Sequence, residues 1–373
     1  MRRPNFSFKL VGFALLGLGL GACQAIAGIE ERKLDPDADD AHSNSKQCKD
    51  YCTTVMANCT GKNAVYTTEK LCLGVCGQLE PGDPNEPEGN TVACRAHQAA
   101  IATAEPAVDC IAAGPGGNGV CGSDCDAYCQ IFPKVCKDDY EYTSTASCLQ
   151  ACSGLTDQAN RYDVMKDHGG DTIECRLVHV SSATDDPTTH CPHAPIRPTE
   201  PWCTPPAKEP PTCEQYCKIE LVACTDELAQ YESEDQCLKV CAALPPGLNE
   251  DIAGNTVGCR RYHSFNSTLL PAAHCSHSGP SGDGHCGDAE TGSCESYCAL
   301  LVAACPDEFQ TSMGSADACL AACAKLPEHE ANTGYTLAKA KVSTGLHCRI
   351  LHAVQAFEDK TACASAIGGD QCK

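Results

Sequence analysis

Two short motifs place a histidine on each side of a cysteine: HCPH at residues 190–193 and HCSH at residues 274–277. A further histidine, His285, lies ten residues after Cys275. Neutral imidazoles gathered in a loop are good ligands for Zn²⁺ or Cu²⁺. The candidate metal ligands are therefore His190, His193, His274, His277 and His285.

A second stretch that could do chemistry is NTVGCRRYHS at residues 255–264. It brings a cysteine, a pair of arginines and a histidine close together along the chain. Cys259, Arg260 and His263 could begin a metal site, or a nucleophile with its base. Which of these applies, if either, depends on the elements that position the three residues.

Those elements form an internal repeat built on cysteine. The chain of 373 residues has 33 cysteines, a density typical of disulfide-bonded proteins in an oxidising compartment. Apart from Cys23 they form four sets of eight, each opening C-x3-C-x6-C and later showing C-x3-C. The sets define module 1 (48–121), module 2 (125–203), module 3 (213–286) and module 4 (294–372). Modules 1 and 3 share all seven spacings between successive cysteines, which is the strongest signal in the chain.

The repeat favours a scaffold role for the CRRYH segment. Cys259 belongs to an even set of eight, which leaves no spare thiol. His263 has counterparts in modules 2 and 4, but module 1 has His97 one position early, where a helix has turned by about 100°. An arginine follows the sixth cysteine in every module, and such a residue pairs with an acidic side chain or covers a helix end. We therefore interpret Arg260 and His263 as architecture.

The motifs HCPH and HCSH, unlike the repeated arginine, occur in only two of the four modules. Cys110 in module 1 and Cys363 in module 4 occupy the equivalent positions and have no flanking histidine. Metal binding, if present, is therefore expected in modules 2 and 3 alone. The alternative is that these histidines pack or are solvated in their loops.

No other pattern points to catalysis. The sequence has no C-x-x-C redox motif and no C-x-x-C-H haem attachment motif, and no set of acid, base and nucleophile repeats. We therefore expect no catalytic residues, no cofactor and no enzymatic activity. The formal net charge of −22 would repel a phosphate backbone, so nucleic acid is excluded as a partner.

The first residues have the layout of a secretory signal. A basic head precedes an apolar run of 11 residues, Leu10–Leu20, which is too short to span a bilayer. The run ends in LGAC, which resembles the lipobox of bacterial lipoproteins. That resemblance implies a signal peptide at 1–22, a lipid on Cys23 and export across the inner membrane. Because Gln24 follows, it also implies anchoring in the outer membrane, with the protein in the periplasm or on the cell surface. The alternative is a plain secretory signal with a chance cysteine.

The remaining segments are expected to be a stalk, a spacer and helices. Residues 23–47 carry the lipidated cysteine and are expected to form an acidic, flexible stalk. The proline-rich residues 204–212 are expected to form a stiff spacer between two module pairs. In each module C-x3-C-x6-C falls on one stripe of a first helix. The later C-x3-C lies on a second helix, and a third ends at a proline in modules 1 to 3.

The expected fold class is therefore mainly α: four tandem small disulfide-stapled helical modules. Each has about three short helices plus a Gly/Pro-rich loop. With only 5% aromatic residues, such modules depend on disulfides for stability.

Successive helices that each carry C-x3-C resemble the nested hairpin of the α-hairpinins. In module 3 that resemblance implies the disulfides Cys213–Cys241 and Cys217–Cys237. The other four cysteines would then pair as Cys224–Cys259 and Cys275–Cys286, with equivalents in the other modules. Eight cysteines allow many other pairings.

The chain as a whole resembles uncharacterised cysteine-rich repeat lipoproteins of myxobacteria-like bacteria, through its lipobox and its repeated NT-x-x-CR motif. That resemblance implies no activity. We expect a lipid-anchored protein of the cell envelope that acts as a structural or multivalent binding and adhesion element. Its partners would be the membrane and an unidentified protein or glycan. The alternative function is binding or sequestration of zinc or copper through the loop histidines of modules 2 and 3.

Overall fold

The fold comes from a computed structural model that describes residues 43, 45–85, 87–155, 162–167, 169–197, 202–287, 292–369 and 371–372. Over these residues the protein is helical, and its β pairing is limited to isolated bridges, such as that between Glu80 and Thr91. The predicted fold class, mainly α with small disulfide-stapled modules, is confirmed. None of the helices described is both long and apolar enough to cross a membrane. The predicted signal peptide, Cys23 and nearly all of the predicted stalk lie outside the described residues.

The first two helices of each module form a disulfide-bonded hairpin. The first helices are α2 (Lys46–Asn58), α6 (Asp124–Val135), α10 (Cys213–Ala223) and α14 (Cys294–Ala304). The second helices are α3 (Glu69–Gln78), α7 (Thr145–Ser153), α11 (Glu234–Ala243) and α16 (Ala316–Cys323). Each second helix begins after a serine or threonine whose side chain accepts a hydrogen bond from the backbone amide three residues on.

Nested disulfides join these hairpins in all four modules. The first cysteine of a module is bonded to the fifth, and the second to the fourth. In module 3 these are Cys213–Cys241 and Cys217–Cys237, the pairs that the resemblance to α-hairpinins implied.

Each module has a fourth helical segment that was not predicted. The third helices are α4 (Val92–Ile101), α8 (Ile173–Ser182), α12 (Val257–Ser267) and α18 (Leu346–Gln355). The fourth segments are α5 (Pro106–Ala113), α9 (Pro187–His190) with the 3₁₀ turn η2 (Cys191–His193), α13 (Pro271–Ser278), and η4 (Lys360–Ala362) with α19 (Cys363–Ala366). The prolines that were expected only to end the third helix also begin the next one. Proline suits the first helical position because its fixed φ is helical and it has no amide hydrogen to leave unpaired.

Short additional elements complete the modules. They are η1 (Gly61–Asn63), η3 (Asp226–Leu228), α15 (Pro306–Ser312) and α17 (Leu337–Ala340).

The fourth helix explains why two of the predicted disulfides are wrong. The structure pairs Cys224 with Cys275 and Cys259 with Cys286, not Cys224 with Cys259 and Cys275 with Cys286. Helix α13 packs against α10 and α12, which brings its cysteine to the C-cap of α10. Cys259, near the start of α12, bonds instead to Cys286 in the loop that closes the module. The same third-to-seventh and sixth-to-eighth pairing is present in every module.

A buried tyrosine and a buried arginine hold the end of the fourth helix. In module 3 the Tyr216 hydroxyl donates to the Ser278 carbonyl at 2.5 Å, and Arg260 Nε donates to the Gly279 carbonyl at 3.1 Å. Of the two roles predicted for the repeated arginine, covering a helix end is confirmed. Tyr51 and Arg95 make the same bonds in module 1, and Tyr128 and Arg176 make them in module 2. In module 4 Tyr297 bonds likewise, whereas Arg349 is half-buried and donates through Nη1.

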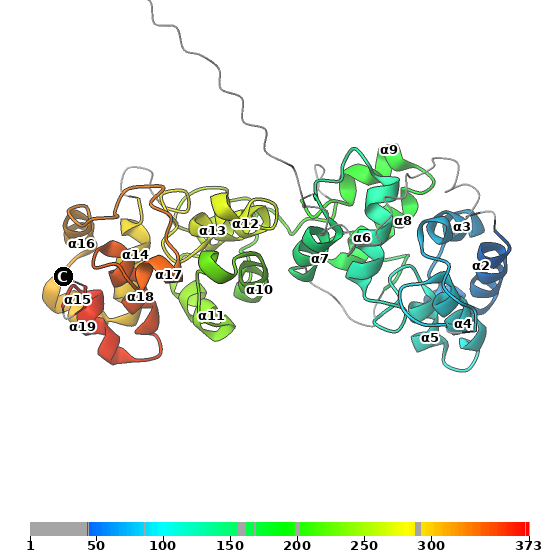
Figure 1. Ribbon diagram of the computed structural model, residues 1–373, viewed down its shortest axis with the longest axis horizontal. Helices are drawn as coiled ribbons and strands as arrows, with labels where there is room; N and C mark the ends of the chain where they lie inside the picture. The colour runs from blue at the N-terminus through cyan, green and yellow to red at the C-terminus, as the bar shows by residue number, and fades with distance from the viewer. Residues whose placement is uncertain are drawn as a thin grey trace, which may run out of the picture.

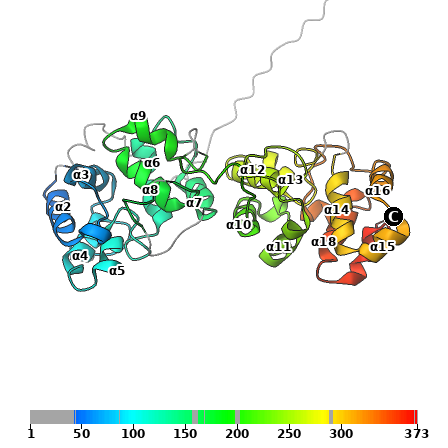
Figure 2. The same cartoon turned by 180° about the vertical axis from the view of Figure 1, so that it is seen from behind.

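The modules are arranged as two pairs. Helices α2–α9 form one lobe and α10–α19 the other (Figures 1 and 2). The buried apolar side chains of modules 1 and 2 form one core, and most of those of modules 3 and 4 form a second. Ile219 of α10 crosses from module 3 into the first core, where it is fully buried.

Buried charges lie at the joint between the two pairs. Asp171 of module 2 accepts a hydrogen bond from Arg176 Nη2 at 2.8 Å and forms a second ion pair with Arg261 of module 3. The proline-rich residues 204–212, predicted to be a stiff spacer, are also tied to module 3. Two of their carbonyls accept hydrogen bonds from the amides of Asn249 and Glu250 in module 3.

Candidate metal centres

The two predicted histidines of module 2 meet a third. His190 lies at the end of α9, His193 at the end of η2, and His179 reaches them from α8. Nδ1 of His179 is 3.1 Å from Nδ1 of His190 and 3.2 Å from Nδ1 of His193. One ligand atom from each of the three lies within 4.8 Å of the others. His179 and His193 are buried, whereas His190 is half-buried.

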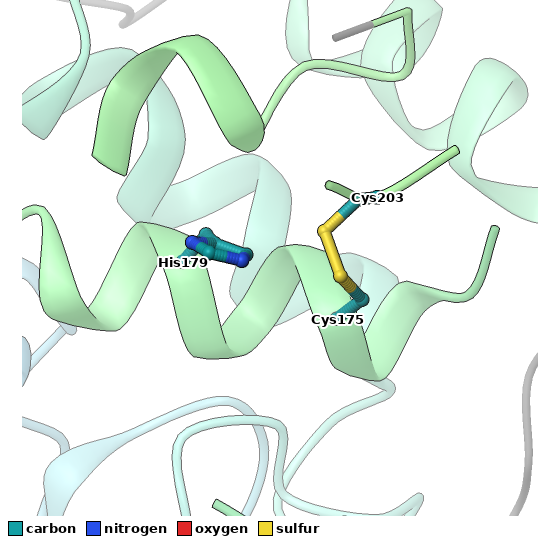
Figure 3. Close-up of side chains that lie close together, drawn as sticks. All are labelled: Cys175, His179 and Cys203. Carbon is teal, nitrogen blue, oxygen red and sulfur yellow. A yellow bond between two sulfur atoms is a disulfide. The ribbon is translucent and has the colours of Figure 1, made fainter. Parts of the chain in front are cut away.

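Disulfides fix the elements that carry these side chains. Cys191 lies between the two histidines of the HCPH motif and is bonded to Cys136 at the end of α6. His179 lies one turn along α8 from Cys175, which is bonded to Cys203 (Figure 3). The three imidazoles are therefore held in place by cross-links that do not depend on a ligand.

Module 3 contains an equivalent cluster. His274 and His277 lie one turn apart on α13, and His263 faces them from α12. Nδ1 of His263 is 3.1 Å from Nδ1 of His274, and one ligand atom from each of the three histidines lies within 4.8 Å of the others. The fifth predicted ligand, His285, stacks on His277 with 3.6 Å between ring centroids. All five histidines predicted from the two motifs thus lie in one or other cluster.

Sequence reasoning missed His179 and His263, which it assigned to the scaffold. The available signal was that both stand four residues after the sixth cysteine of a module that has an HCPH or HCSH motif, although His352 of module 4 has the same position without such a motif. In module 1 the corresponding histidine, His97, stands one position early. That module has no histidine beside Cys110, so His97 has no histidine cluster to join. The side chain of His97 is exposed.

The short contacts between ring nitrogens also suit a shared metal ion. A ring nitrogen has one in-plane position, which holds either a proton or a lone pair, yet Nδ1 of His179 faces two other Nδ1 atoms. Nδ1 of His277 is buried with no hydrogen-bond partner in the described part of the chain. Two nitrogens that bind one tetrahedral zinc ion lie about 3.3 Å apart. The observed separations therefore suit a shared metal ion.

The electrostatics keep the module 3 imidazoles neutral. Burial, followed by the neighbouring His277, His274 and His285, lowers the pKa of His263 to about 3. Burial and then His285 lower the pKa of His277 to about 4, and burial and then Arg197 lower the pKa of His274. Neutral imidazole is the form that binds metal ions.

The cysteines beside the clusters supply no ligands. Sulfur atoms of Cys175 and Cys203 lie close to His179, and those of Cys259 and Cys286 lie close to His263. Both pairs are disulfides and offer no thiolate. The two candidate centres are therefore made of imidazole nitrogen alone, which suits Zn²⁺ or Cu²⁺.

The fold and the site together define a class: tandem disulfide-bonded helical modules, of which two carry a histidine cluster. Residues 22–124 and 208–289, slightly less than half of the chain, match the BfoA family C-terminal domain. The Aurasperone B biosynthesis cluster protein A of Aspergillus niger is 36% identical over 69 residues. The Bifonsecin B biosynthesis cluster protein A of Aspergillus brasiliensis is 35% identical over 69 residues. Each match covers 18% of this chain and 23% of the relative. No solved structure gives a significant match.

The likeness to this family covers one module with a histidine cluster and one without. The two matched segments contain modules 1 and 3, which share their cysteine spacings. Module 1 has neither of the histidine–cysteine–histidine motifs. The candidate centres therefore rest on the geometry of modules 2 and 3.

Proposed function

We propose that the protein binds or sequesters Zn²⁺ or Cu²⁺ at two all-histidine centres. The module 2 centre is His179, His190 and His193, and the module 3 centre is His263, His274 and His277. The observation that carries the proposal is the convergence of three imidazole nitrogens in each module, with Nδ1–Nδ1 separations of 3.1–3.2 Å. A single ion can bind all three nitrogens of a cluster.

Two further properties of the chain support this function. The net charge of −22 attracts cations toward the protein. The disulfides beside each cluster hold the ligands in place before metal arrives, so little conformational entropy is lost on binding. We infer a binding role and not catalysis.

Metal content is the direct test. The full chain with Cys23→Ser, stripped with a chelator and dialysed against Zn²⁺, is expected to hold two ions per chain by mass spectrometry under native conditions. His193→Ala and His277→Ala should each lose one ion, and the double variant both, because each change removes one of three ligands. His97→Ala and His352→Ala are matched controls that should keep two. A double variant that still holds two ions would contradict the proposal.

The chain carries its own reporter for module 2. Trp202 is the only tryptophan, and its ring lies 5.4 Å from that of His193. Added Cu²⁺ should therefore quench tryptophan fluorescence in the wild type and in His277→Ala. The quenching should disappear in His193→Ala.

We also propose that the protein is a lipid-anchored, multivalent element of the cell envelope. The supporting observation is the LGAC sequence ending at Cys23 behind an apolar run. Anionic headgroups repel a chain of net charge −22, so acyl chains would supply the attachment. The repeated modules suit attachment to several copies of a partner.

Replacing Cys23 tests the anchor. Cys23→Ser should move the protein from the detergent-soluble membrane fraction to the soluble fraction, because the thiol that carries the lipid is lost. Gln24→Ala is the control and should stay with the membrane. A Cys23→Ser protein that remains in the membrane fraction would count against a lipid anchor.

A further inference from the structure

A cavity of about 390 Å³ lies at the joint between modules 2 and 3. Asp171, Arg176 and Arg197 line it from module 2, and Arg261 and Phe265 line it from α12 of module 3. None of the six histidines proposed as metal ligands is among its described lining residues. Its volume lies in the range in which proteins hold small organic molecules. The cavity is therefore a candidate binding site separate from the metal centres.

Hydrogen bonds and ion pairs hold the two walls of the cavity together. Asp171 of module 2 is paired with Arg261 of module 3, and Gln215 of α10 bonds to both. The amide of Gln215 donates to Asp171 Oδ2 at 2.7 Å, and its carbonyl oxygen accepts from Arg261 Nε at 3.2 Å. Arg197 of module 2 also donates to the side chain of Asn266 on α12. These contacts shape the cavity before any ligand enters.

The cavity has an excess of positive charge, although the chain as a whole has a net charge of −22. Its described lining contains three arginines and two carboxylates. The ion-pair partners just outside that lining are one glutamate and one lysine, whose charges cancel. Asp171 is shared between Arg176 and Arg261, and all three side chains are buried. Among these groups one positive charge has no counter-ion, which is costly at a buried site and favours a bound anion.

Two hydrogen-bond donors in the lining can bind that anion. Nε and Nη2 of Arg261 are bonded to Gln215 and Asp171, whereas Nη1 makes no hydrogen bond within the described part of the chain. The hydroxyl of Tyr262, a half-buried residue, also makes none with the described residues. Guanidinium and phenol groups both donate to carboxylate oxygens, and the bond from the guanidinium is strengthened by charge. A carboxylate also carries the single negative charge that the cavity lacks.

Much of the remaining lining is apolar or aromatic. Ile196, Pro205 and Ala207 contribute aliphatic surface, and the Phe265 ring lies beneath the guanidinium of Arg261, with 4.9 Å from ring centroid to Cζ. A small hydrated anion would leave this surface in contact with water, whereas a ring attached to the carboxylate would cover it. Aromatic rings also stack favourably on phenyl and guanidinium groups. The lining therefore favours an aromatic carboxylate.

We infer that the cavity between modules 2 and 3 binds a small aromatic carboxylate, whose charge is held by Arg261 and Tyr262 and whose ring lies against the apolar wall. This inference does not depend on metal binding. It makes the joint between the two module pairs a ligand site as well as a connection.

Calorimetric titration with benzoate tests the ligand class. The full chain with Cys23→Ser is first treated with a chelator, so that a carboxylate cannot bind to a metal ion. Benzoate should bind at one site per chain with a Kd below about 1 mM. Acetate lacks the ring and benzamide lacks the charge, so each should bind at least about tenfold more weakly. Acetate or benzamide binding as tightly as benzoate would overturn the assignment.

Variants of the lining locate the ligand. Ala207→Trp should abolish binding, because the indole fills the cavity from an exposed position. Ala100→Trp, at an exposed position of α4 in module 1, is the matched control and should bind benzoate unchanged. Arg261→Lys should weaken binding about tenfold, since lysine keeps the charge but loses the planar set of donors. Tyr262→Phe, which removes only the hydroxyl, should weaken it about threefold.

Circular dichroism checks that each variant keeps its helices, and the affinities then decide. Benzoate binding that persists in Ala207→Trp, or that is lost equally in Ala100→Trp, would show that the ligand does not occupy this cavity. Unchanged affinity in both Arg261→Lys and Tyr262→Phe would overturn the role of the two donors. A starting chain that does not bind benzoate would overturn the inference and leave the proposed metal centres intact, because the test contains no metal.

Discussion

A chain in which Cys224 and Cys275 are both replaced by alanine is expected to lose the metal ion of module 3 together with about 4 kcal/mol of stability. The stability effect follows from opening a disulfide whose partners are 51 residues apart in sequence. The effect on metal binding follows from position. This bond holds α13 on the C-cap of α10, and Cys275 lies directly beside His274. Without the bond, two of the three ligands are no longer held against His263.

The matched control removes a disulfide of the same module that lies away from the cluster. Cys217→Ala/Cys237→Ala opens a bond with a sequence separation of 20, which should cost about 3 kcal/mol. Because α13 remains tied to α10, this variant should keep its ion at low temperature. Zinc content and denaturant unfolding measure the two effects separately. Equal loss of zinc in both variants would show that general destabilisation, and not the position of the bond, controls binding.

The second large effect is a pH-dependent destabilisation caused by Glu220. This side chain of α10 is 1% exposed, and neither of its carboxyl oxygens has a hydrogen-bond partner in the described residues. Burial raises its pKa to about 8, and the nearby Ser278 and Arg260 offset only part of that rise. Between its usual pKa near 4.5 and about 8, the folded chain keeps a proton that the unfolded chain has released. Stability must therefore fall as pH rises through this window, by up to about 1.4 kcal/mol per pH unit.

Glu220→Gln should remove this dependence because glutamine is neutral at every pH. The variant should be close to wild type at pH 4.5 and more stable by several kcal/mol at pH 8.5, in metal-free protein. Hydrogen exchange of the α10 amides, compared with wild type at each pH, measures the difference in module 3. The histidine clusters are present in both chains, so their titration cancels. A difference that stays constant from pH 4.5 to 8.5 would contradict the assignment.

The cysteine repeat allowed much of the fold to be predicted. Cysteines at C-x3-C spacing must bond to another helix, since neighbours on one helix turn are too far apart to bond to each other. That constraint, with the α-hairpinin resemblance, led to the nested pairs. The other pairs failed because Pro271 was read as the end of a helix, whereas it also begins α13. Without α13 there was no reason to place Cys275 beside Cys224.

The histidine centres were predicted in part for a related reason. The HCPH and HCSH motifs are local, so the sequence revealed the two histidines that each contributes to its cluster. His179 and His263 come from a different helix, and their approach depends on how α8 and α12 pack. The isolation of Glu220 was equally hidden, because a glutamate on an amphipathic helix is ordinarily exposed and only tertiary packing buries it.

The pairing of modules into two shared cores has a consequence for the history of the chain. Modules 1 and 3 have 17 residues between their fifth and sixth cysteines, whereas modules 2 and 4 have 22 and 24. In each lobe, a module with the shorter segment is therefore followed by a module with the longer one. This order indicates that the unit copied by gene duplication was a pair and not a single module. The histidine clusters break that order, since they occupy the second module of one pair and the first of the other. They were therefore gained or lost after the duplication, on a scaffold that was already complete.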